Sequence, residues 1–415
     1  MITTSQSSLR AGAAATDITP PLEVGILMSA VNRLWAPFER VRMPLHARAL
    51  VIENDKQRYA LVSLELLGLA ARAVGGHRRF RARVLKAAGK AVTDRNLILA
   101  STHTHTGPET LAATDLYKTA PFKRWVDHLA DQIGLAIRRA ADSLEPAHVD
   151  AATVEAPGLC IYRRFKTTRG IVLSSDPPPE NQIISREGPT DPAVHVLRLR
   201  GADDHTIAIL VNATCHAIHE MCIPQISPDY PGEMSRLLEE AYPGGTVLFF
   251  NGAAGNTNPP TASEGADRAL EHGRALAGFV DKALAVAVTL DVAPIALRRK
   301  RVALPGKSIR TGKPIKTPLR TQIAALRIGQ AAMVFLPGEP FVEIGLQIKA
   351  ASPFVNTAVV AYAEDMIGYL PVDAAFDEGG YELGPGARAR AHRGTEAVLV
   401  NAAAELLNEL AAQPA

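Results

Sequence analysis

Residues 97–108 constrain the fold more than any other stretch, and they read LILASTHTHTGP. The first four residues are apolar or small, as in a buried strand, and Gly107 and Pro108 end the segment. If the backbone stays extended beyond the strand, His103 and His105 at i and i+2 project from the same face. Two imidazoles placed in this way can share one metal ion, whereas a hydrogen-bonded turn among the threonines is the competing interpretation. A metal ion bound here would need further ligands from other strand ends.

The composition is that of a globular protein with a large core. The chain has 415 residues, of which 47% are hydrophobic and 21% are charged. Its 45 lysines and arginines nearly balance 42 acidic residues, for a net charge of +3. The bulk electrostatics therefore favour neither nucleic acid nor an anionic membrane as a partner. A basic run at residues 298–301 is interpreted as a solvent-exposed strand end.

Cysteine use and the N-terminal sequence bear on the compartment. The chain has three cysteines, Cys160, Cys215 and Cys222, which are too few and too irregular for a disulfide framework. The first 21 residues lack a basic start followed by a long apolar segment. No run of about 18 apolar residues occurs elsewhere. We therefore expect a cytoplasmic protein without a transmembrane segment.

Hydrophobic periodicity predicts an alternation of strands and helices. Apolar runs predict strands at residues 46–53, 59–67, 97–100, 148–155, 193–199, 207–213, 246–250, 322–328, 332–336 and 358–362. Helical spacing predicts helices at residues 71–91, 125–144, 233–241 and 268–287. Residues 167–192 are rich in Ser, Pro, Glu and Arg and are predicted to form a long surface loop. Because no change in composition marks a boundary, we predict one compact α/β domain over residues 1–415, with mixed β-sheets flanked by helices.

Three predicted strand ends offer metal ligands. His103 and His105 follow one strand, His216 and His219 follow another, and Glu339 follows the apolar run at 332–336. Two histidines and one carboxylate are a familiar set for catalytic zinc, and they leave a position at which water can lose a proton near neutral pH. The spacing around His216 fits neither helical zinc-protease motif, so His219 is assigned to the core or to the surroundings of the site.

A loop of small residues follows the predicted strand at 246–250. It reads NGAAGNTNPP at 251–260 and is rich in glycine, alanine and asparagine. Such a loop can expose backbone N–H groups to an oxyanion or a metal-bound group. A tight turn of small residues is the alternative.

Eight motifs follow one another along the chain: the segment at 12–21 ending in DITPP, STHTHTGP at 101–108, residues 212–216, SPDYPG at 227–232, NGAAGNTNP at 251–259, LPGE at 336–339, GYLP at 368–371 and GGYE at 379–382. In this order, the motifs resemble those of the neutral, non-lysosomal ceramidases and their shorter bacterial relatives. They span nearly the whole chain, so the resemblance is to a catalytic domain rather than to one motif.

The resemblance implies a single zinc ion and a set of site residues. The implied zinc ligands are His103, His216, Glu339 and Tyr369. His105 is implied to lie beside the metal, where it steadies the substrate carbonyl or relays a proton. Tyr381 is implied to stabilise the tetrahedral intermediate. Arg163 or its neighbour Arg164 corresponds to an arginine that contacts substrate in the family.

The sequence departs from the family in two respects. Ceramidases carry a serine that takes part in catalysis, and Asn258 stands at that position here. An amide side chain cannot act as a nucleophile, so we assign Asn258 to orienting the substrate or the attacking water. We also expect no C-terminal immunoglobulin-like domain of the kind that ceramidases have.

These inferences predict a Zn²⁺-dependent hydrolase. We expect it to cleave an amide (N-acyl) bond of a small molecule through a metal-activated water, with His105 and Tyr381 stabilising the oxyanion. An ester or lactone is the alternative substrate on the same site. A catalytically inactive binding protein of the same fold and a metal-dependent isomerase or lyase are the rival functions. The sequence leaves the oligomeric state open, and a homo-oligomer is compatible with it.

Overall fold

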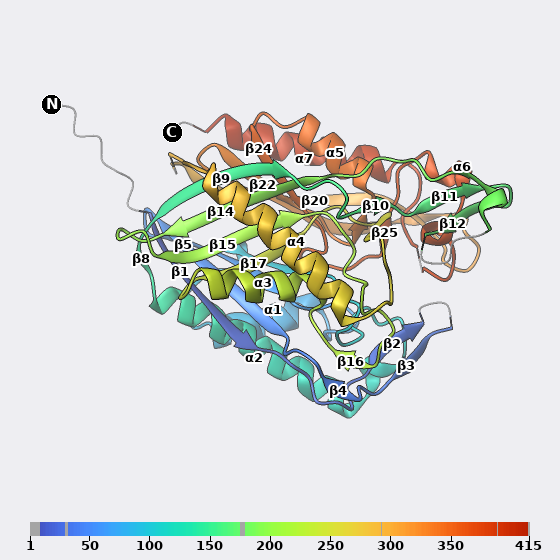
Figure 1. The fold of residues 1–415 in the computed structure, drawn as a ribbon, viewed down its shortest axis with the longest axis horizontal. Coiled ribbons are helices and arrows are strands. Elements are labelled where there is room, and N and C mark those ends of the chain that lie inside the picture. The colour runs from blue at the N-terminus through green and yellow to red at the C-terminus, as the bar shows by residue number, and fades with distance from the viewer. Residues whose placement is uncertain (1–8, 30–31, 175–178, 292, 388, 414–415) are drawn as a thin grey trace.

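Three large β-sheets surround a common core in the computed structural model (Figure 1). The structure describes residues 9–29, 32–174, 179–291, 293–387 and 389–413. The first sheet, in the order β7-β6-β5-β1-β8, consists of β1 (Arg10–Asp17), β5 (His46–Asn54), β6 (Gln57–Leu64), β7 (Leu97–Ser101) and β8 (Glu145–Pro146). The second sheet, in the order β17-β15-β14-β9-β19, consists of β9 (His148–Glu155), β14 (Ala193–Arg200), β15 (Thr206–Ala213), β17 (Thr246–Asn251) and β19 (Val288–Thr289). The third, in the order β20-β21-β22-β24, consists of β20 (Ile295–Lys307), β21 (Pro314–Ile328), β22 (Ala331–Phe335) and β24 (Asn356–Val360).

One hydrophobic cluster joins the inner faces of these sheets. It contains Leu50 and Leu61 from the first sheet, Leu210 and Phe250 from the second, and Phe335 from the third. All five side chains are buried. Because each sheet contributes to the same core, burial of apolar surface holds the sheets together.

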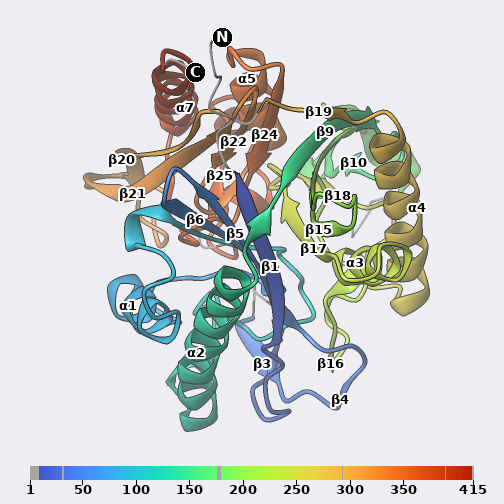
Figure 2. The ribbon, with the colours of Figure 1, turned by 90° about the vertical axis from the view of Figure 1, so that its left-hand side faces the viewer.

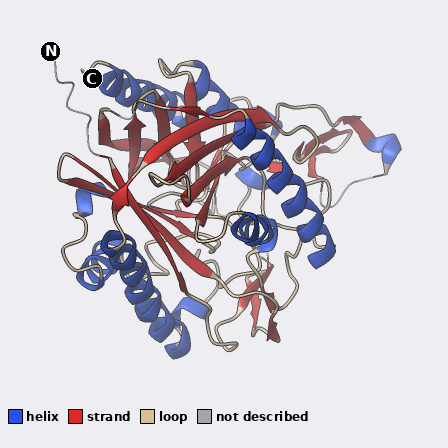
Figure 3. Cartoon of the chain, turned by 60° about the vertical axis from the view of Figure 1, so that its left-hand side comes forward, coloured by secondary structure: helices blue, strands red, loops and turns tan. Residues whose placement is uncertain are grey.

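Helices cover the outer face of each sheet, as Figures 2 and 3 show. The first sheet is covered by α1 (His77–Ala87) and α2 (Ala120–Asp142), the second by α3 (Asp229–Ala241) and α4 (Ala266–Ala285), and the third by α5 (Val342–Ala350) and α7 (Thr395–Ala411). A strand with a core on both faces needs a continuous apolar run. The TIAILVNA sequence of β15 is buried at every position for this reason.

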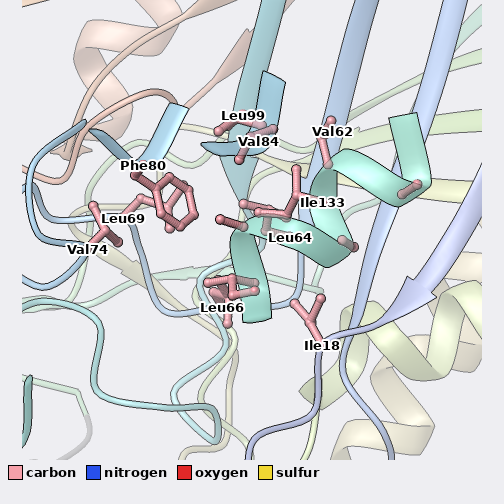
Figure 4. Close-up of a cluster of buried hydrophobic side chains, with 14 of the residues drawn as sticks. Ile18, Val62, Leu64, Leu66, Leu69, Val74, Phe80, Val84, Leu99 and Ile133 are labelled. Atoms are coloured by element: carbon pink, nitrogen blue, oxygen red, sulfur yellow. The ribbon is translucent and has the colours of Figure 1, made fainter. Parts of the chain in front are cut away.

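The helix pair on the first sheet illustrates how sequence directs this packing. The Thr119 hydroxyl accepts a hydrogen bond from the Phe122 N–H at 3.4 Å and so caps α2. Gly134 lies where α1 crosses α2, because a Cβ there would be 2.4 Å from that of Ala87. Phe80 of α1 and Ile133 of α2 pack with apolar residues of the first sheet (Figure 4).

Each large sheet contains one parallel pair of strands, and the carboxyl ends of these pairs meet. The pairs are β6 with β7, β15 with β17, and β22 with β24. Asn251, the last residue of β17, forms hydrogen bonds with the segments that follow β7, β15 and β24. Its Nδ2 donates to the carbonyl of Thr102 at 3.1 Å and to that of Cys215 at 2.8 Å. Its own carbonyl accepts the N–H of Ala361 at 2.9 Å. The chain segments that follow three separate sheets are therefore fixed at one place.

Replacement of Asn251 by alanine is expected to lower the free energy of unfolding by about 2–3 kcal/mol, because it leaves the buried Thr102 carbonyl without its Asn251 donor and the Cys215 N–H without its Asn251 acceptor. Chemical denaturation of the variant beside Asn408→Ala measures this effect. Asn408 is exposed on α7, so its replacement should change the unfolding free energy by less than about 0.5 kcal/mol. Equal stability of the two variants would show that Asn251 does not join the sheets.

Short strands form several smaller sheets. The strand pairs are β2 (Ile26–Ser29) with β3 (Leu34–Ala36), β4 (Arg40–Val41) with β16 (Gln225–Ile226), β10 (Ile161–Tyr162) with β18 (Thr257–Asn258), and β23 (Glu339–Pro340) with β25 (Tyr369–Leu370). A three-stranded sheet contains β11 (Arg164–Thr167), β12 (Gly170–Leu173) and β13 (Ile183–Ser185). The remaining elements are α6 (Ala375–Glu378) and the 3₁₀ turns η1 (Asp94–Asn96), η2 (Leu116–Lys118), η3 (Glu180–Gln182) and η4 (Tyr381–Leu383).

The predicted α/β class with mixed sheets and flanking helices is confirmed, and several local predictions are wrong. The expected loop at 167–192 contains β12 and β13, two short strands that pair with β11 on either side; their apolar runs of three residues or fewer are too brief to stand out in a segment rich in Ser, Pro, Glu and Arg. Residues 175–178 lie outside the described ranges. The first helix begins at His77 rather than at residue 71. The basic run at 298–301 lies in the middle of β20 rather than at a strand end. The helices α5 and α7 were not predicted.

None of the helices in the described ranges combines the length and the apolar character that crossing a bilayer requires.

Candidate metal centre

The convergent strand ends place four polar side chains close together. His103 follows β7, and His216 follows β15. Glu339 begins β23, shortly after β22, and Tyr369 begins β25, after β24. Glu339 and Tyr369 are direct partners in the parallel pairing of β23 with β25. The cluster therefore takes residues from segments that follow strands of all three large sheets.

The backbone at His103 differs from the extended continuation that the sequence predicted. The strand ends at Ser101, and His103 has a φ of 67°, in the left-handed region that non-glycine residues seldom adopt. The expectation that alternation along an extended chain aligns the two histidines is therefore wrong. The ring of His103 is instead fixed by the Leu67 carbonyl, 2.6 Å from Nδ1, and by stacking on Tyr362 at 3.9 Å between ring centroids.

His216 is held by the loop of small residues after β17. Its Nδ1 lies 2.6 Å from the carbonyl of Ala254 and 3.0 Å from that of Thr257. The loop thus contributes carbonyl groups to this site. The N–H of Gly255 is bonded to the Pro340 carbonyl at 2.9 Å, which favours the packed-turn interpretation over an oxyanion cradle at this position.

Gly255 also shows why the loop needs small residues. A Cβ at this position would lie 2.5 Å from the carbonyl oxygen of Glu339 and 2.8 Å from that of Pro340. The absence of a side chain therefore lets the loop that holds His216 approach the strand that carries Glu339.

The ligand atoms form a nearly regular triangle. His103 Nε2 lies 3.2 Å from His216 Nε2 and 3.3 Å from Glu339 Oε2. His216 Nε2 lies 3.4 Å from the same carboxylate oxygen. Two ligands that are each bound at ~2.0–2.1 Å by one tetrahedral ion lie roughly 3.3 Å apart. The triangle therefore has the dimensions of three corners of a zinc coordination sphere.

The hydrogen-bonding state of these atoms points to a cation. Each Nδ1 faces a carbonyl and must donate its proton, so the Nε2 of a neutral ring carries a lone pair. Glu339 Oε2 is buried and has no hydrogen-bond partner among the described residues. Three lone pairs that face one another without a donor are unfavourable unless a positive ion lies between them. The donor set therefore fits a divalent metal.

The protonation states agree with this arrangement. Burial lowers the pKa of His216 to about 4. Burial by itself would raise the pKa of Glu339, but the adjacent His103 and His216 hold it well below its usual value. At neutral pH the His216 imidazole is therefore neutral and the Glu339 carboxylate is ionised, which are the forms that bind metal.

His105 lies beside this triangle. Its Nε2 is 3.2 Å from that of His103, and the ligand atoms of His103, His105 and His216 all lie within 4.8 Å of one another. No described backbone carbonyl holds its Nδ1. Burial lowers the pKa of His105 well below its usual value, and the charges of His103 and His216 lower it further. The His105 ring is therefore neutral at neutral pH, and it is less constrained than the rings of His103 and His216, whose Nδ1 atoms each face a carbonyl.

Arg163 connects Tyr369 with Asn258. It donates from Nη2 to the Tyr369 hydroxyl at 3.2 Å and from Nη1 to Asn258 Oδ1 at 3.4 Å. The rings of Tyr369 and Tyr381 meet edge to face with centroids 6.0 Å apart. The structure therefore brings Tyr369, Tyr381, Asn258 and Arg163 together, whereas Arg164 is directed elsewhere.

Glu382 organises the two neighbouring arginines and was missed as a site residue. Its Oε1 accepts from Arg163 Nε at 2.9 Å, and its Oε2 accepts from Arg164 Nη1 at 2.6 Å. The side chains of Glu382 and Arg164 are 0% exposed. The residue pair Tyr381 and Glu382 after two glycines was visible in the sequence, but nothing there indicated that Glu382 bridges to residues 163 and 164.

Other contributors were also missed. Tyr362, which stacks on His103, stood only at the end of a predicted strand. The hydroxyl of Ser174 accepts a hydrogen bond from Asn258 Nδ2 at 3.2 Å, although Ser174 lies in the segment expected to be a loop. Backbone carbonyls such as that of Leu67 carry no sequence signal at all.

His219 lies in a separate buried network. Its Nδ1 is 2.9 Å from the Thr261 hydroxyl, and its Nε2 is 3.0 Å from Nδ1 of His272. This placement agrees with its assignment outside the ligand set.

Comparison with known proteins relates this geometry to one family. The family model described as neutral/alkaline non-lysosomal ceramidase, N-terminal, matches residues 9–248. A solved structure described as a ceramidase complexed with C2 is 20% identical and superimposes with a TM-score of 0.77, over 98% of this chain and 75% of that one. The neutral ceramidase from Pseudomonas aeruginosa is also 20% identical, with a TM-score of 0.74 over 97% of this chain and 75% of that one. No curated protein sequence matches the chain significantly.

Proposed function

The chain belongs to the neutral/alkaline non-lysosomal ceramidase family, and on that premise we propose that it is a zinc-dependent hydrolase of amide (N-acyl) bonds. The observation that carries the proposal is the triangle of His103 Nε2, His216 Nε2 and Glu339 Oε2, whose sides of 3.2, 3.3 and 3.4 Å suit one zinc ion. The Tyr369 hydroxyl is the proposed fourth protein ligand. When bound, zinc would supply a Lewis acid that activates water and polarises the substrate carbonyl.

The other side chains have distinct proposed roles. His105 is neutral at neutral pH, so it can take a proton from the attacking water and later give it to the leaving amine. Burial, with a contribution from Glu339, raises the pKa of Tyr381 to about 12, so its hydroxyl keeps its proton and can donate to the developing oxyanion. Arg163 is charged and buried beside Asn258, so the two can orient polar groups of the substrate.

We further propose that residues 1–415 act as a single catalytic domain. The shared core of the three sheets supports this, because the ligands come from strand ends of all three. The proposed partner is a small-molecule amide, with an ester or lactone as the alternative.

Metal content and chelation test the proposal directly. The protein is purified without added metal, analysed by mass spectrometry for bound metals, and assayed on a panel of N-acyl amides before and after treatment with a zinc chelator. We expect one zinc per chain, hydrolysis of at least one amide, and loss of hydrolysis on chelation that added zinc restores. Hydrolysis that survives complete removal of metal would contradict the proposal.

Other outcomes of this experiment distinguish the rival functions. Bound zinc without hydrolysis of amides, esters or lactones would identify a binding protein of this fold. Products that have not gained the mass of one water would identify an isomerase or lyase.

The role of His105 predicts a separation of metal binding from turnover. We expect His105→Gln to lower kcat by about 10²-fold, which is typical for the loss of a general acid–base group, while zinc content is unchanged. His128→Gln, at an exposed position on α2, is the matched control and should retain full activity. If the His105 variant loses zinc together with activity, His105 is a ligand and not a proton carrier.

A further inference from the structure

An arginine-lined cleft lies between α1 and the long strands β20 and β21, and residues from the segments 77–95, 299–322 and 364–365 line it. Its volume is about 990 Å³. Figure 2 shows α1 next to the projecting ends of these strands. The arginines that line the cleft are Arg78, Arg81, Arg95, Arg299, Arg301 and Arg320.

Strand pairing directs several of these side chains to one face. Arg299 and Arg301 are two residues apart on β20 and therefore point the same way. Arg301 is paired with Gln322, and Ala303 with Arg320, across the β20–β21 register. Directly opposed residues share a face of the sheet, so Arg320 lies on the same face as the two arginines of β20.

The carboxylates in the cleft are already engaged. Glu364 pairs with Arg81 at 3.1 Å and with Arg299 at 2.6 Å. Asp94 also pairs with Arg81, at 2.7 Å, and Asp365 lies 2.8 Å from His77 Nε2. These three acidic residues therefore serve to hold the inner wall of the cleft.

Four guanidinium groups remain without such a partner. The side chains of Arg78, Arg95, Arg301 and Arg320 are exposed and form no hydrogen bond or ion pair with any described residue. Like charges held around one cavity repel one another, and an anion that enters relieves this repulsion. The arrangement therefore creates a local excess of positive charge that the balanced composition of the chain conceals.

The orientation of α1 adds to this field. Its 11 residues start at His77, and its first turn contains no acidic residue. The N–H groups at a helix N-terminus favour a nearby negative charge. No side chain of the first turn supplies one, and Arg78 in that turn adds a positive charge. The helix end and the four arginines thus favour the same kind of ligand.

We propose that this cleft binds a phosphate-bearing anion. Guanidinium groups match phosphate oxygens in paired, charge-assisted hydrogen bonds, and several of them recognise a multiply charged group better than a single carboxylate. The phosphate can belong to a free compound or to a lipid headgroup. The proposal is independent of the reaction at the metal centre, because none of these arginines contacts the metal ligands.

Calorimetric titration with inorganic pyrophosphate tests the proposal, with Arg301→Gln/Arg320→Gln as the cleft variant. Loss of two charge-assisted contacts should weaken binding by about 10-fold or more, and binding to the unaltered protein should weaken as salt increases. Arg138→Gln/Arg274→Gln is the control, because it removes the same charge from exposed positions on α2 and α4. Arg78→Gln is a second cleft variant on a different element.

Sedimentation with phosphatidylglycerol or phosphatidylcholine vesicles distinguishes the two sources of phosphate. Pyrophosphate binding that is weakened only in the cleft variants supports a free phosphate compound. Binding to phosphatidylglycerol vesicles alone, weakened only in the cleft variants, supports a headgroup. Absence of both interactions in the unaltered protein, or equal weakening by the control variant, would overturn the proposal.

Discussion

Replacing His103 with alanine is expected to abolish both metal binding and hydrolysis. Its Nε2 lies 3.2 Å from those of His105 and His216 and 3.3 Å from Glu339 Oε2, so it occupies the centre of the cluster. Loss of an outer partner of a metal ligand typically costs about 10–100-fold in affinity or activity, so loss of the ligand itself should lower turnover by about 10³-fold or more. Mass spectrometry for zinc and an assay of the best N-acyl amide measure the two effects.

A matched control separates the loss of the ligand from general damage. His148→Ala removes an exposed imidazole from β9 and should leave zinc content and turnover unchanged. Circular dichroism of the His103 variant should retain the native spectrum, because the β7 strand and its neighbours do not depend on the imidazole. A His103 variant with full zinc content and full turnover would show that the assigned site is wrong.

The second large effect is expected on stability. Glu382→Ala leaves Arg163 and Arg164 buried without their shared carboxylate, and removal of one partner of a buried ion pair costs about 3–5 kcal/mol. The remaining partners of Arg163 are neutral, namely the Tyr369 hydroxyl and Asn258 Oδ1. Chemical denaturation should therefore show a large loss of unfolding free energy.

Glu378→Ala is the control for this prediction. Glu378 also pairs with Arg164, at 3.0 Å, but its side chain is 44% exposed. Water can replace much of this interaction, so we expect a loss below about 1 kcal/mol. Similar losses in the two variants would show that burial of Glu382 does not determine its contribution. The Glu382 variant should also lose turnover at temperatures where it is folded, because Arg163 is no longer oriented.

Part of the candidate metal centre could be predicted from local patterns. His103, His216 and Glu339 each follow a buried apolar run, and a polar residue at the end of such a run is visible in the sequence. Ligands at strand ends tend to converge where the carboxyl ends of parallel strands meet. The assignments of Tyr369, Tyr381 and Arg163 depended instead on the family resemblance, because nothing in their spacing identifies them.

Contacts between distant segments could not be predicted. Glu382 meets Arg163 across 219 residues of chain, and no periodicity records such a pair. The left-handed backbone at His103 depends on the Leu66 and Leu67 carbonyls, which bind its N–H and Nδ1. The short strands β12 and β13 gain their hydrogen bonds from β11, and their apolar runs are too brief to predict strands within a polar segment.

The overall arrangement was predicted only as a class. The alternation of strands and helices indicated α/β, and the apolar runs at 207–213 and 246–250 predicted the strands β15 and β17. That three sheets share one core, with Asn251 at their junction, follows from pairings between remote strands. The basic run at 298–301 was misinterpreted for the same reason, since its place in the middle of β20 depends on the pairing of β20 with β21.

Anomalous diffraction from crystals of the purified protein, recorded on both sides of the zinc absorption edge, tests the central claim most directly. We expect one strong zinc-specific peak within bonding distance of His103 Nε2, His216 Nε2 and the Glu339 carboxylate. A fully formed cluster without a peak in zinc-replete protein, or a zinc peak bound elsewhere, would contradict the account.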